Sequence, residues 1–203
     1  EVKFSKIVLF VLSITISYLI AKNFNTKVLY STLLISSALY LFFITMTDVR
    51  NEKLKLSQRI SHSAFSILII SIILNSLFSE EVSVNLKKGE EKRLSSYLLK
   101  FENISKKEID NFTSLKAEIH VIQNDKRLKF YPELRLYKVP ATITSEADIK
   151  TNLFSDNLVV VNYLKDTDYL NIRYQKKPFM LLIWLSAFML AVGGLIGLRK
   201  NFK

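Results

Sequence analysis

The stretch ISHSAFSILIISIILNSLF, Ile60–Phe78, decides what class of protein this is. It runs for 19 residues without an Asp, Glu, Lys or Arg. A helix of that length, rising about 1.5 Å per residue, matches the roughly 30 Å hydrocarbon core of a bilayer. The stretch therefore predicts a transmembrane helix.

Three further apolar runs lie on either side of it. Val28–Thr47 and Phe179–Leu198 are equally long and equally free of charge. Ile7–Ala21 holds only 15 residues, between Lys6 and Lys22. Lysines at both ends of a short span can extend to the membrane interface, so this run also predicts a helix. The sequence thus predicts four transmembrane helices, at about 7–21, 28–47, 60–78 and 179–198.

The charge of the chain is concentrated beside these runs. The 203 residues are 49% hydrophobic and carry a net charge of +11, with no cysteine. Residues 79–177 hold 18 basic and 15 acidic residues, whereas the remainder holds 11 basic and 3 acidic ones. Membrane proteins carry their basic excess in this way, which argues against a nucleic-acid partner. Without cysteine, disulfides and thiolate chemistry are excluded.

The short loops predict an orientation. Two basic residues, Lys22 and Lys27, fall in the loop between the first two runs. Both termini and the 48–59 loop together hold nine: Lys3, Lys6, Arg50, Lys53, Lys55, Arg59, Arg199, Lys200 and Lys203. Basic residues remain in the cytoplasm, so the termini and this loop are predicted to be cytoplasmic. Residues 79–177 then lie outside the cytoplasm.

The polar middle of the chain has the pattern of β-strands. Apolar residues alternate in Val82–Leu86 and in Leu115–Val121. A strand with Leu128 and Phe130 follows a polar turn at Gln123–Lys126, and residues 158–163 and 169–174 predict another hairpin. Six or so short strands predict a small sandwich or open barrel. The layout is three transmembrane helices within 1–78, an extracytoplasmic all-β domain at 79–177, and a last helix with a cytoplasmic tail at 178–203.

His62 is the candidate site residue. It lies two or three residues inside the cytoplasmic end of the third apolar run. An ionisable side chain in a span is costly and faces a partner, a cavity or a cofactor, and imidazole is a common axial ligand of haem iron. A polar contact between helices, or a histidine extending to the interface, explains the same position. From the residues alone, these readings stay open.

Other residues carry weaker signals. His120 shares its strand face with Lys116 and Glu118, which predicts a solvent-exposed histidine. Gly193 and Gly197 form a small-xxx-small pair, which predicts close packing of the last helix on a neighbour. The sequence has no P-loop, no nucleotide fingerprint, no nucleophile–base pair and no metal-ligand cluster. No catalytic residue is predicted.

The entry to the last helix has its own pattern. Pro178 is expected in the first helical turn, where its missing N–H costs nothing. Phe179 and Trp184 fit an aromatic belt at the membrane interface, and Lys176 and Lys177 are expected in the headgroup layer.

A series of short motifs, of which the first contains His62, runs along the chain. They are Ser61–Phe65, Lys88–Glu90, Asn111–Phe112, Tyr131–Tyr137, Thr144–Ile149, Lys177–Phe179, Ile183–Leu185 and Val192–Gly194. With this order and topology, the chain from about Leu54 to its end resembles the C-terminal part of the CcmF-type cytochrome c haem lyases of system I cytochrome c maturation. The first two spans match that family only in hydropathy.

The resemblance implies a function. It implies that His62 is one axial ligand to the iron of a haem b that keeps the transferred haem reduced. The family attaches haem covalently to apocytochrome c, and it receives haem from a periplasmic chaperone of the CcmE type. Thioreduction and apocytochrome-handling subunits of the CcmH and CcmI types are the other implied partners.

The chain also departs from the family pattern. The tryptophan-rich haem-handling segment, the pair of periplasmic histidines and the first transmembrane histidine have no counterpart in these residues. Leu182 and Ser186 stand where the family often has tryptophan and glycine. We therefore expect the C-terminal part of a split lyase, or a fragment of a whole one, which is not catalytic without its N-terminal remainder.

The expected location is the bacterial inner membrane with the β domain in the periplasm, and the alternative is the mitochondrial inner membrane. A function from another class also fits the residues: a membrane-anchored periplasmic β domain that acts as a non-catalytic docking or scaffold module.

Overall fold

The computed structural model describes residues 4–23, 27–50, 54–124, 126–164 and 167–201. The chain divides into a helical unit, which contains the segments up to Ser79 and from Pro178 onward, and a β unit, Glu80–Lys177. Of the basic residues that set the predicted orientation, Lys3, Lys53 and Lys203 lie outside the described residues, and the orientation stays a prediction.

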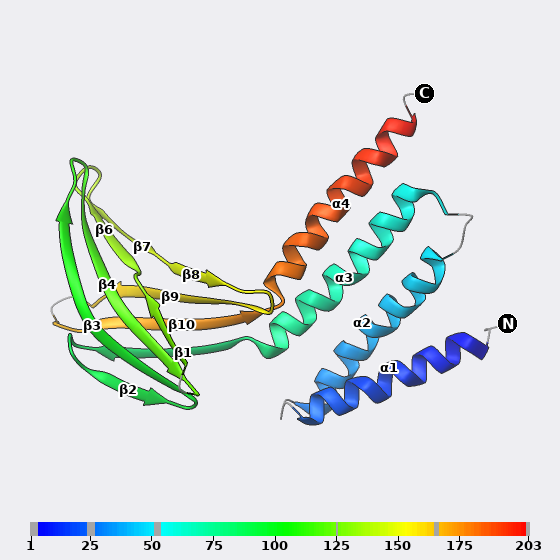
Figure 1. Ribbon diagram of the computed structural model, residues 1–203, viewed down its shortest axis with the longest axis horizontal. Helices are drawn as coiled ribbons and strands as arrows, with labels where there is room; N and C mark the ends of the chain where they lie inside the picture. Colours follow the sequence, from blue (N-terminus) through cyan, green and yellow to red (C-terminus); the bar gives the residue numbers. More distant parts are fainter. Residues whose placement is uncertain (1–3, 24–26, 51–53, 125, 165–166, 202–203) are drawn as a thin grey trace. The chain divides into compact units, whose positions relative to one another are not determined.

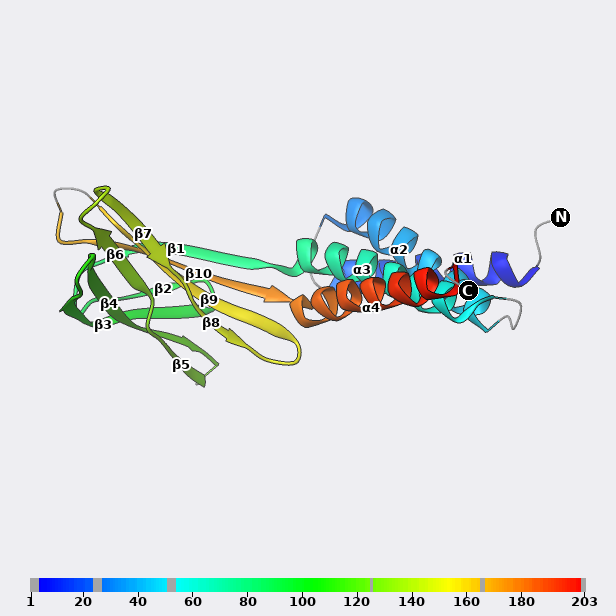
Figure 2. The same ribbon diagram turned by 90° about the horizontal axis from the view of Figure 1, so that it is seen from above.

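The helical unit confirms the four predicted apolar helices. They are α1 (Phe4–Asn23), α2 (Val28–Val49), α3 (Leu56–Phe78) and α4 (Met180–Asn201). All four are long and apolar enough to cross a membrane. The first is 20 residues long, so its length comes from the turns that carry Lys6 and Lys22 as well as from its apolar run. In Figures 1 and 2 the helices follow one another in a row, α1 against α2, α2 against α3 and α3 against α4.

The helices are packed through small residues and expose large ones. Buried positions within the described residues include Ser13, Ser17, Ser31, Ala38, Ala64, Ser66 and Ser186. Large side chains such as Leu33, Phe188 and Leu195 are more than 60% exposed. Small residues allow helix backbones to approach each other, and a hydrocarbon solvent solvates leucine as well as a protein interior does. This distribution is that of a membrane protein.

The buried hydroxyls of Ser17 and Ser186 find acceptors on their own helix. Ser17 Oγ donates to the Ser13 carbonyl at 2.6 Å, and Ser186 Oγ donates to the Leu182 carbonyl at 2.6 Å. Such bonds to the preceding turn satisfy a polar group where no water is present. These serines therefore serve close packing without leaving a free hydroxyl.

The β unit contains ten strands within the described residues, against the six or so that the sequence predicts. They are β1 (Glu80–Leu86), β2 (Glu91–Leu94), β3 (Tyr97–Glu108), β4 (Phe112–Gln123), β5 (Lys126–Phe130), β6 (Glu133–Tyr137), β7 (Thr142–Glu146), β8 (Asp148–Thr151), β9 (Ser155–Tyr163) and β10 (Leu170–Pro178). Short strands such as β2, β7 and β8 expose at least half of their residues and bury none, so they carry no apolar alternation.

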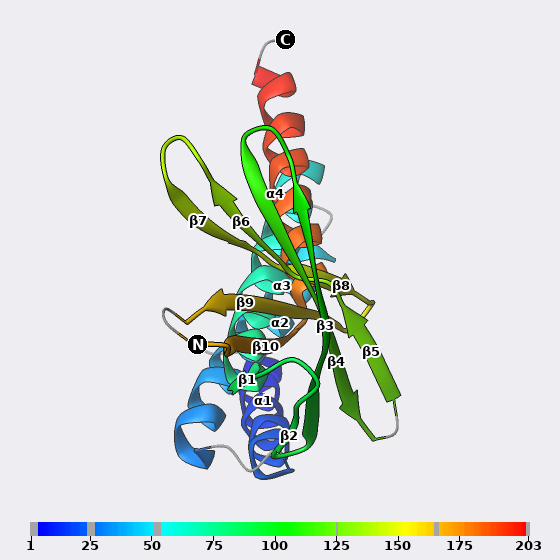
Figure 3. The ribbon, with the colours of Figure 1, turned by 90° about the vertical axis from the view of Figure 1, so that its left-hand side faces the viewer.

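Two sheets form a β-sandwich, one of the two predicted architectures. One sheet has the order β1-β10-β9-β8, and the other has the order β2-β3-β4-β6-β7 with β5 also paired to β4. The strands of the two sheets cross steeply in Figure 3. β5 and β6 pair with opposite halves of β4, and they are separated at Pro132, which has no N–H to continue a ladder.

The core lies between the two sheets. The alternating residues Ala117, Ile119 and Val121 of β4 and Val84 and Leu86 of β1 are buried, as the sequence predicts. On β5, Phe130 is fully buried, whereas Leu128 is 37% exposed. The rings of Tyr97 and Tyr174 join the two sheets with their centroids 4.9 Å apart.

The passage from β10 into α4 differs from the prediction. Pro178 is the last residue of β10 and not part of the first helical turn. Phe179 turns the chain with a φ of +62°, and the first helical bond runs from Ile183 N–H to the Phe179 carbonyl. The Pro178 carbonyl instead accepts a hydrogen bond from Asn75 Nδ2 on α3 at 2.5 Å, which links the end of α3 to the start of α4.

Candidate functional site

His62 lies deeper in its helix than the apolar run indicates. α3 begins at Leu56, four residues before that run, because the Lys55 N–H is capped by Gln58 Oε1 at 3.1 Å. His62 is six residues beyond Leu56, which is about 9 Å along the helix axis. The histidine is therefore in the second turn of α3.

The side of α3 that carries His62 is open. His62 itself is exposed, and the same side continues through Phe65, Ile69, Ile72 and Ser76 at helical spacing. Phe65 is 50% exposed and Ile72 is 45% exposed. No described residue forms a hydrogen bond or ion pair with His62. An imidazole and a stripe of apolar side chains are thus free to meet another molecule.

The neighbouring side of α3 is occupied by α4. A Cβ placed on Gly193 would lie 3.1 Å from Ser61 N, and a Cβ on Gly197 would lie 3.7 Å from Ser57 Cβ. Gly194 faces open space. The two glycines four residues apart therefore meet two serines four residues apart, which confirms the predicted packing role of the glycine pair.

The packing of α3 buries, at least in part, most of the residues that neighbour His62 in the sequence. Ser61 faces α4 and Ala64 is fully buried, so neither belongs to the open side. Ser66, which the helical spacing also places near the histidine, is fully buried and donates to the Ser63 carbonyl at 2.9 Å. Phe65 remains the exposed aromatic neighbour one turn away.

The open side fits a haem group at one face only. A histidine ligand needs a free ring nitrogen aimed away from its helix, and a macrocycle needs an apolar surface beside it. His62 and the exposed Phe65 meet both conditions. His62 is the only histidine in the described part of the helical unit, because His120 belongs to the β unit. A haem held by two histidines would need its second histidine from outside this unit.

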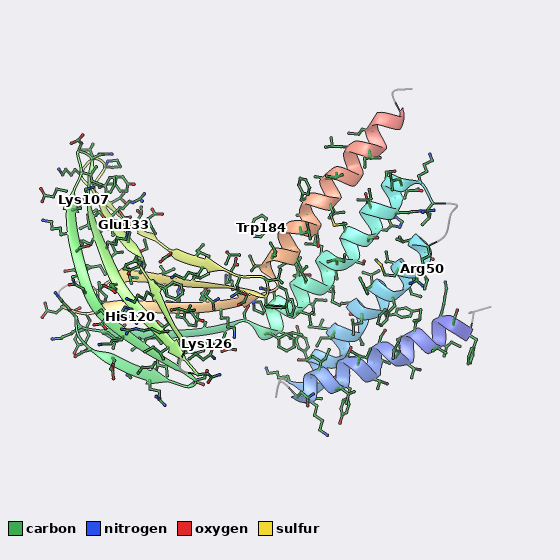
Figure 4. All side chains as sticks on the ribbon, in the orientation of Figure 1. Arg50, Lys107, His120, Lys126, Glu133 and Trp184 are labelled. Carbon is green, nitrogen blue, oxygen red and sulfur yellow. The ribbon has the colours of Figure 1, made fainter. Side chains whose placement is uncertain are left out.

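His120 corrects a prediction. The sequence places it on a solvated strand face, yet the residue is only 3% exposed. Its Nε2 lies 2.9 Å from Glu118 Oε1, and its Nδ1 lies 3.2 Å from Glu102 Oε1 and in close contact with Arg127 Nη2. The face is polar, but long side chains from β3 and β5 cover the ring. Figure 4 shows His120 on β4 within the sheet.

The charged residues around His120 form ion pairs and hydrogen bonds within and between β3, β4 and β5. A hydrogen bond from Lys100, at 2.8 Å, together with its charge and those of His120 and Arg127, holds the pKa of the Glu102 carboxyl below its usual range. No group of three His, Cys, Asp or Glu residues in the described part of the chain is arranged to hold a metal ion. Charge pairing between strands explains this cluster, and a ligand role is not needed.

Sequence reasoning missed Glu102 and Arg127 as partners of His120 because they lie on the neighbouring strands β3 and β5. Their only signal is the pairing register, which sets Lys100 opposite His120 on one side and Lys129 opposite it on the other. Residues that face each other in this way interact across strands. A register cannot be read from one strand alone.

The motif at Tyr131–Tyr137 is a packing element of β6. Leu134 is 1% exposed and points into the core, whereas Arg135 and Glu133 pair on the other face at 3.1 Å. The Arg135 guanidinium also lies 5.3 Å from the ring centre of Phe112. A hydrogen bond from Arg135 and, more weakly, one from Ser114 hold the pKa of the Glu133 carboxyl below its usual range. Figure 4 labels Glu133, the first residue of β6.

The motif at Lys88–Glu90 is a turn. Gly89 has a φ of +86°, a conformation that glycine adopts without strain, and its N–H donates to the Phe101 carbonyl at 2.7 Å. Glu90 Oε2 accepts from the Lys87 N–H at 2.9 Å. The motif therefore closes the β1–β2 turn.

Comparison with known proteins identifies the β unit. The family model described as the CcmF C-terminal beta-sandwich matches residues 77–178, half of the chain. The cytochrome c-type biogenesis protein CcmF of Pseudomonas fluorescens is 30% identical over 139 residues, which cover 68% of this chain and 21% of that protein. CcmF of Escherichia coli K12 is 24% identical over 200 residues, which cover 94% of this chain and 31% of that protein.

A solved structure has the same fold. The chain superimposes on a structure titled Cytochrome c Heme Lyase CcmF with a TM-score of 0.69, over 96% of this chain and 34% of that chain, at 11% identity. The chain spans about a fifth to a third of the length of these relatives. Its family model and its fold agree on one assignment. The chain belongs to the CcmF family of cytochrome c-type biogenesis proteins.

Proposed function

We propose that this chain is the C-terminal part of a membrane haem lyase that attaches haem to apocytochrome c, and that His62 supplies one axial ligand of a haem b. The observation that carries the proposal is the exposed imidazole of His62 on the open, apolar side of α3. An ionisable group in a span is costly unless it has a partner. The family supports haem as that partner, because relatives of this chain are named for cytochrome c biogenesis.

A haem b bound at His62 would supply one-electron redox chemistry. The residues of this chain hold and orient the His62 imidazole. Ser61, next to His62, is fixed against Gly193 of α4, so the backbone at the histidine cannot slide or rotate freely. Phe65 then presents an apolar surface one turn away. The second ligand comes from the N-terminal remainder of the lyase.

The proposed location is the bacterial inner membrane, with the β unit in the periplasm and His62 in the cytoplasmic half of the bilayer. The distribution of basic residues between the short loops supports this orientation. The proposed partners are the N-terminal remainder, a haem chaperone of the CcmE type, subunits of the CcmH and CcmI types and apocytochrome c. Thioether formation would take place at the periplasmic side, away from the haem at His62.

The test replaces His62 with alanine in the assembled lyase. Membranes are measured for the b-type absorption band and cells for mature cytochrome c. We expect both to fall while the protein remains in the membrane, and exogenous imidazole should restore part of the band by replacing the lost ligand. Ile72→Ala is the matched control, because Ile72 is exposed on the same side of α3 three turns further along.

A normal band and full maturation in the His62→Ala variant would overturn the ligand assignment. His62 would then be a packing residue of α3. The proposed orientation has a separate test, because Arg50 and Val139 are both exposed. In Arg50→Cys and Val139→Cys variants, an impermeant thiol reagent should label only position 139 from the periplasm, and labelling of position 50 instead would invert the topology.

A further inference from the structure

The turn between β8 and β9 presents two large apolar side chains to solvent. Leu153 is 69% exposed and Phe154 is 74% exposed. The turn is held in shape by Asn152, whose Oδ1 accepts from the N–H groups of Phe154 and Ser155, each at 2.9 Å. The Asn152 N–H also donates to the Ser155 carbonyl at 3.0 Å. The exposure of the two side chains is therefore built into a rigid turn.

Two lysines lie at the same end of the β unit as this turn. Phe154, Lys126 of β5 and Lys176 of β10 all line one open cavity of about 490 Å³. The other described residues of its wall are neutral, including Gln123 and Asn157, and no described carboxylate lines it. No described residue forms an ion pair with Lys126 or Lys176. This end of the unit thus combines an apolar tip with two unpaired cations.

The same end of the unit is the one from which the chain continues into two transmembrane helices. Glu80 of β1 stands opposite Lys176 of β10 in the backbone register of the two strands. Glu80 follows the end of α3 by two residues, and Lys176 precedes the start of α4 by four. Four extended residues span at most about 14 Å. The headgroup layer is itself several ångströms thick on each side of the bilayer, so this end of the β unit is tethered within reach of it.

We propose that this end of the β unit, comprising Leu153, Phe154, Lys126 and Lys176, binds the surface of an anionic lipid bilayer. Leu153 and Phe154 enter the boundary between headgroups and acyl chains, as the apolar side chains of interfacial proteins do. Lys126 and Lys176 bind lipid phosphates beside the apolar tip. The proposal does not depend on haem binding by His62.

The test measures the depth of position 154 in a membrane. Because the chain has no cysteine, Phe154→Cys can be labelled at one site with a nitroxide. The full chain is reconstituted in phosphatidylcholine vesicles with and without phosphatidylglycerol. Collision of the label with oxygen, which concentrates in the bilayer, is compared with collision with a water-soluble nickel chelate.

Val139→Cys is the matched control, because Val139 is 78% exposed and lies at the other end of the unit. It follows Tyr137, which pairs with Phe112 at the start of β4, a strand of 12 residues that spans roughly 40 Å. Figure 4 shows Lys107 and Lys126 at these opposite ends of the long strands. Leu153→Cys gives a second labelled tip that retains Phe154.

We expect the labels at 153 and 154 to lose most of their collisions with the nickel chelate relative to the label at 139, and to gain collisions with oxygen. Equal accessibility of all three labels to the chelate would overturn the proposal. The double change Lys126→Gln with Lys176→Gln should make the label at 154 shallower in vesicles that contain phosphatidylglycerol. An unchanged depth in those vesicles would overturn the role of the lysines.

Discussion

Replacing Gly193 with alanine tests the contact between α3 and α4 directly. A Cβ at this position would lie 3.1 Å from Ser61 N and 3.3 Å from Ile60 Cγ2, and it would overlap Ser61 Oγ. The serine hydroxyl can rotate away, but the backbone nitrogen can move only with the helix. The change therefore forces the two helices apart by a few tenths of an ångström.

The magnitude follows from two opposing effects. Overpacking of a closely packed contact costs about 1–3 kcal/mol. Alanine gains up to about 1 kcal/mol over glycine in helix propensity. Gly194→Ala makes the same gain without the cost, because its Cβ meets nothing within 4 Å. The two variants should differ by about 1–3 kcal/mol, which is roughly 5–150-fold in the helix-pairing equilibrium.

A disulfide across the same contact provides the assay. A Cβ at Gly197 lies 3.7 Å from Ser57 Cβ. Disulfide-linked residues have Cβ atoms about 3.5–4.5 Å apart, so Ser57→Cys with Gly197→Cys should crosslink under oxidation in this cysteine-free chain. The crosslinked fraction is measured in mild detergent as SDS is added. Gly193→Ala should lose crosslinking at a lower SDS fraction than Gly194→Ala.

A second change distinguishes local overlap from a general weakening. Ser61→Ala removes the hydroxyl that overlaps the added methyl group, so it should recover part of the loss in the Gly193→Ala background. Indistinguishable SDS profiles for Gly193→Ala and Gly194→Ala would refute the close approach of the two helices. The fixed position that we assign to the His62 backbone would then lose its physical basis.

Three other predictions concern the start of α4 and the β unit. Leu185→Pro should cost about 3 kcal/mol of helix stability, whereas Leu182→Pro should cost far less, because α4 begins at Met180 and position 182 is in its first turn; helix content in micelles measures the difference. Burial raises the pKa of the Tyr174 phenol to about 12, so this tyrosine should favour folding below about pH 10 and lose that contribution as pH rises to 12; Tyr174→Phe should reduce the alkaline loss of stability in denaturant titrations, and Tyr97, whose pKa is also raised by burial, should retain the rest. The lowered pKa of Glu133 favours folding above about pH 4 and loses this effect as pH falls further, so Arg135→Met should cost about 0.2–1 kcal/mol at neutral pH and less in acid, as urea titrations at both pH values would show.

Much of the architecture was predictable from single segments of the sequence, each taken by itself. Charge-free runs such as Ile60–Phe78 predict their helices because a bilayer requires a fixed length of apolar helix, whatever packs beside it. The alternation in Ala117, Ile119 and Val121 predicts a buried strand face for a similar reason, since side chains of a strand alternate between its faces. The order of short motifs was enough to predict the CcmF family, which the family model confirms.

The start of α3 and the strand count were not predictable in this way. The helix extends to Leu56 because the Gln58 side chain caps the Lys55 N–H there. The start of the apolar run therefore does not mark the start of the helix. Short strands such as β7 and β8 bury none of their residues and are stabilised by their neighbours, so they carry no apolar pattern of their own.

The sequence by itself determined which segments enter the membrane, which part folds as β-sheet, and that His62 is an unusual residue for a span. Only the tertiary structure decided what surrounds each histidine. Ser61 and Ala64 turn toward buried contacts while His62 stays open, and His120 is covered by Arg127 and Glu102 from other strands. The physical reason is that hydropathy and periodicity are local properties of the chain, whereas burial depends on partners brought together by helix packing and strand register.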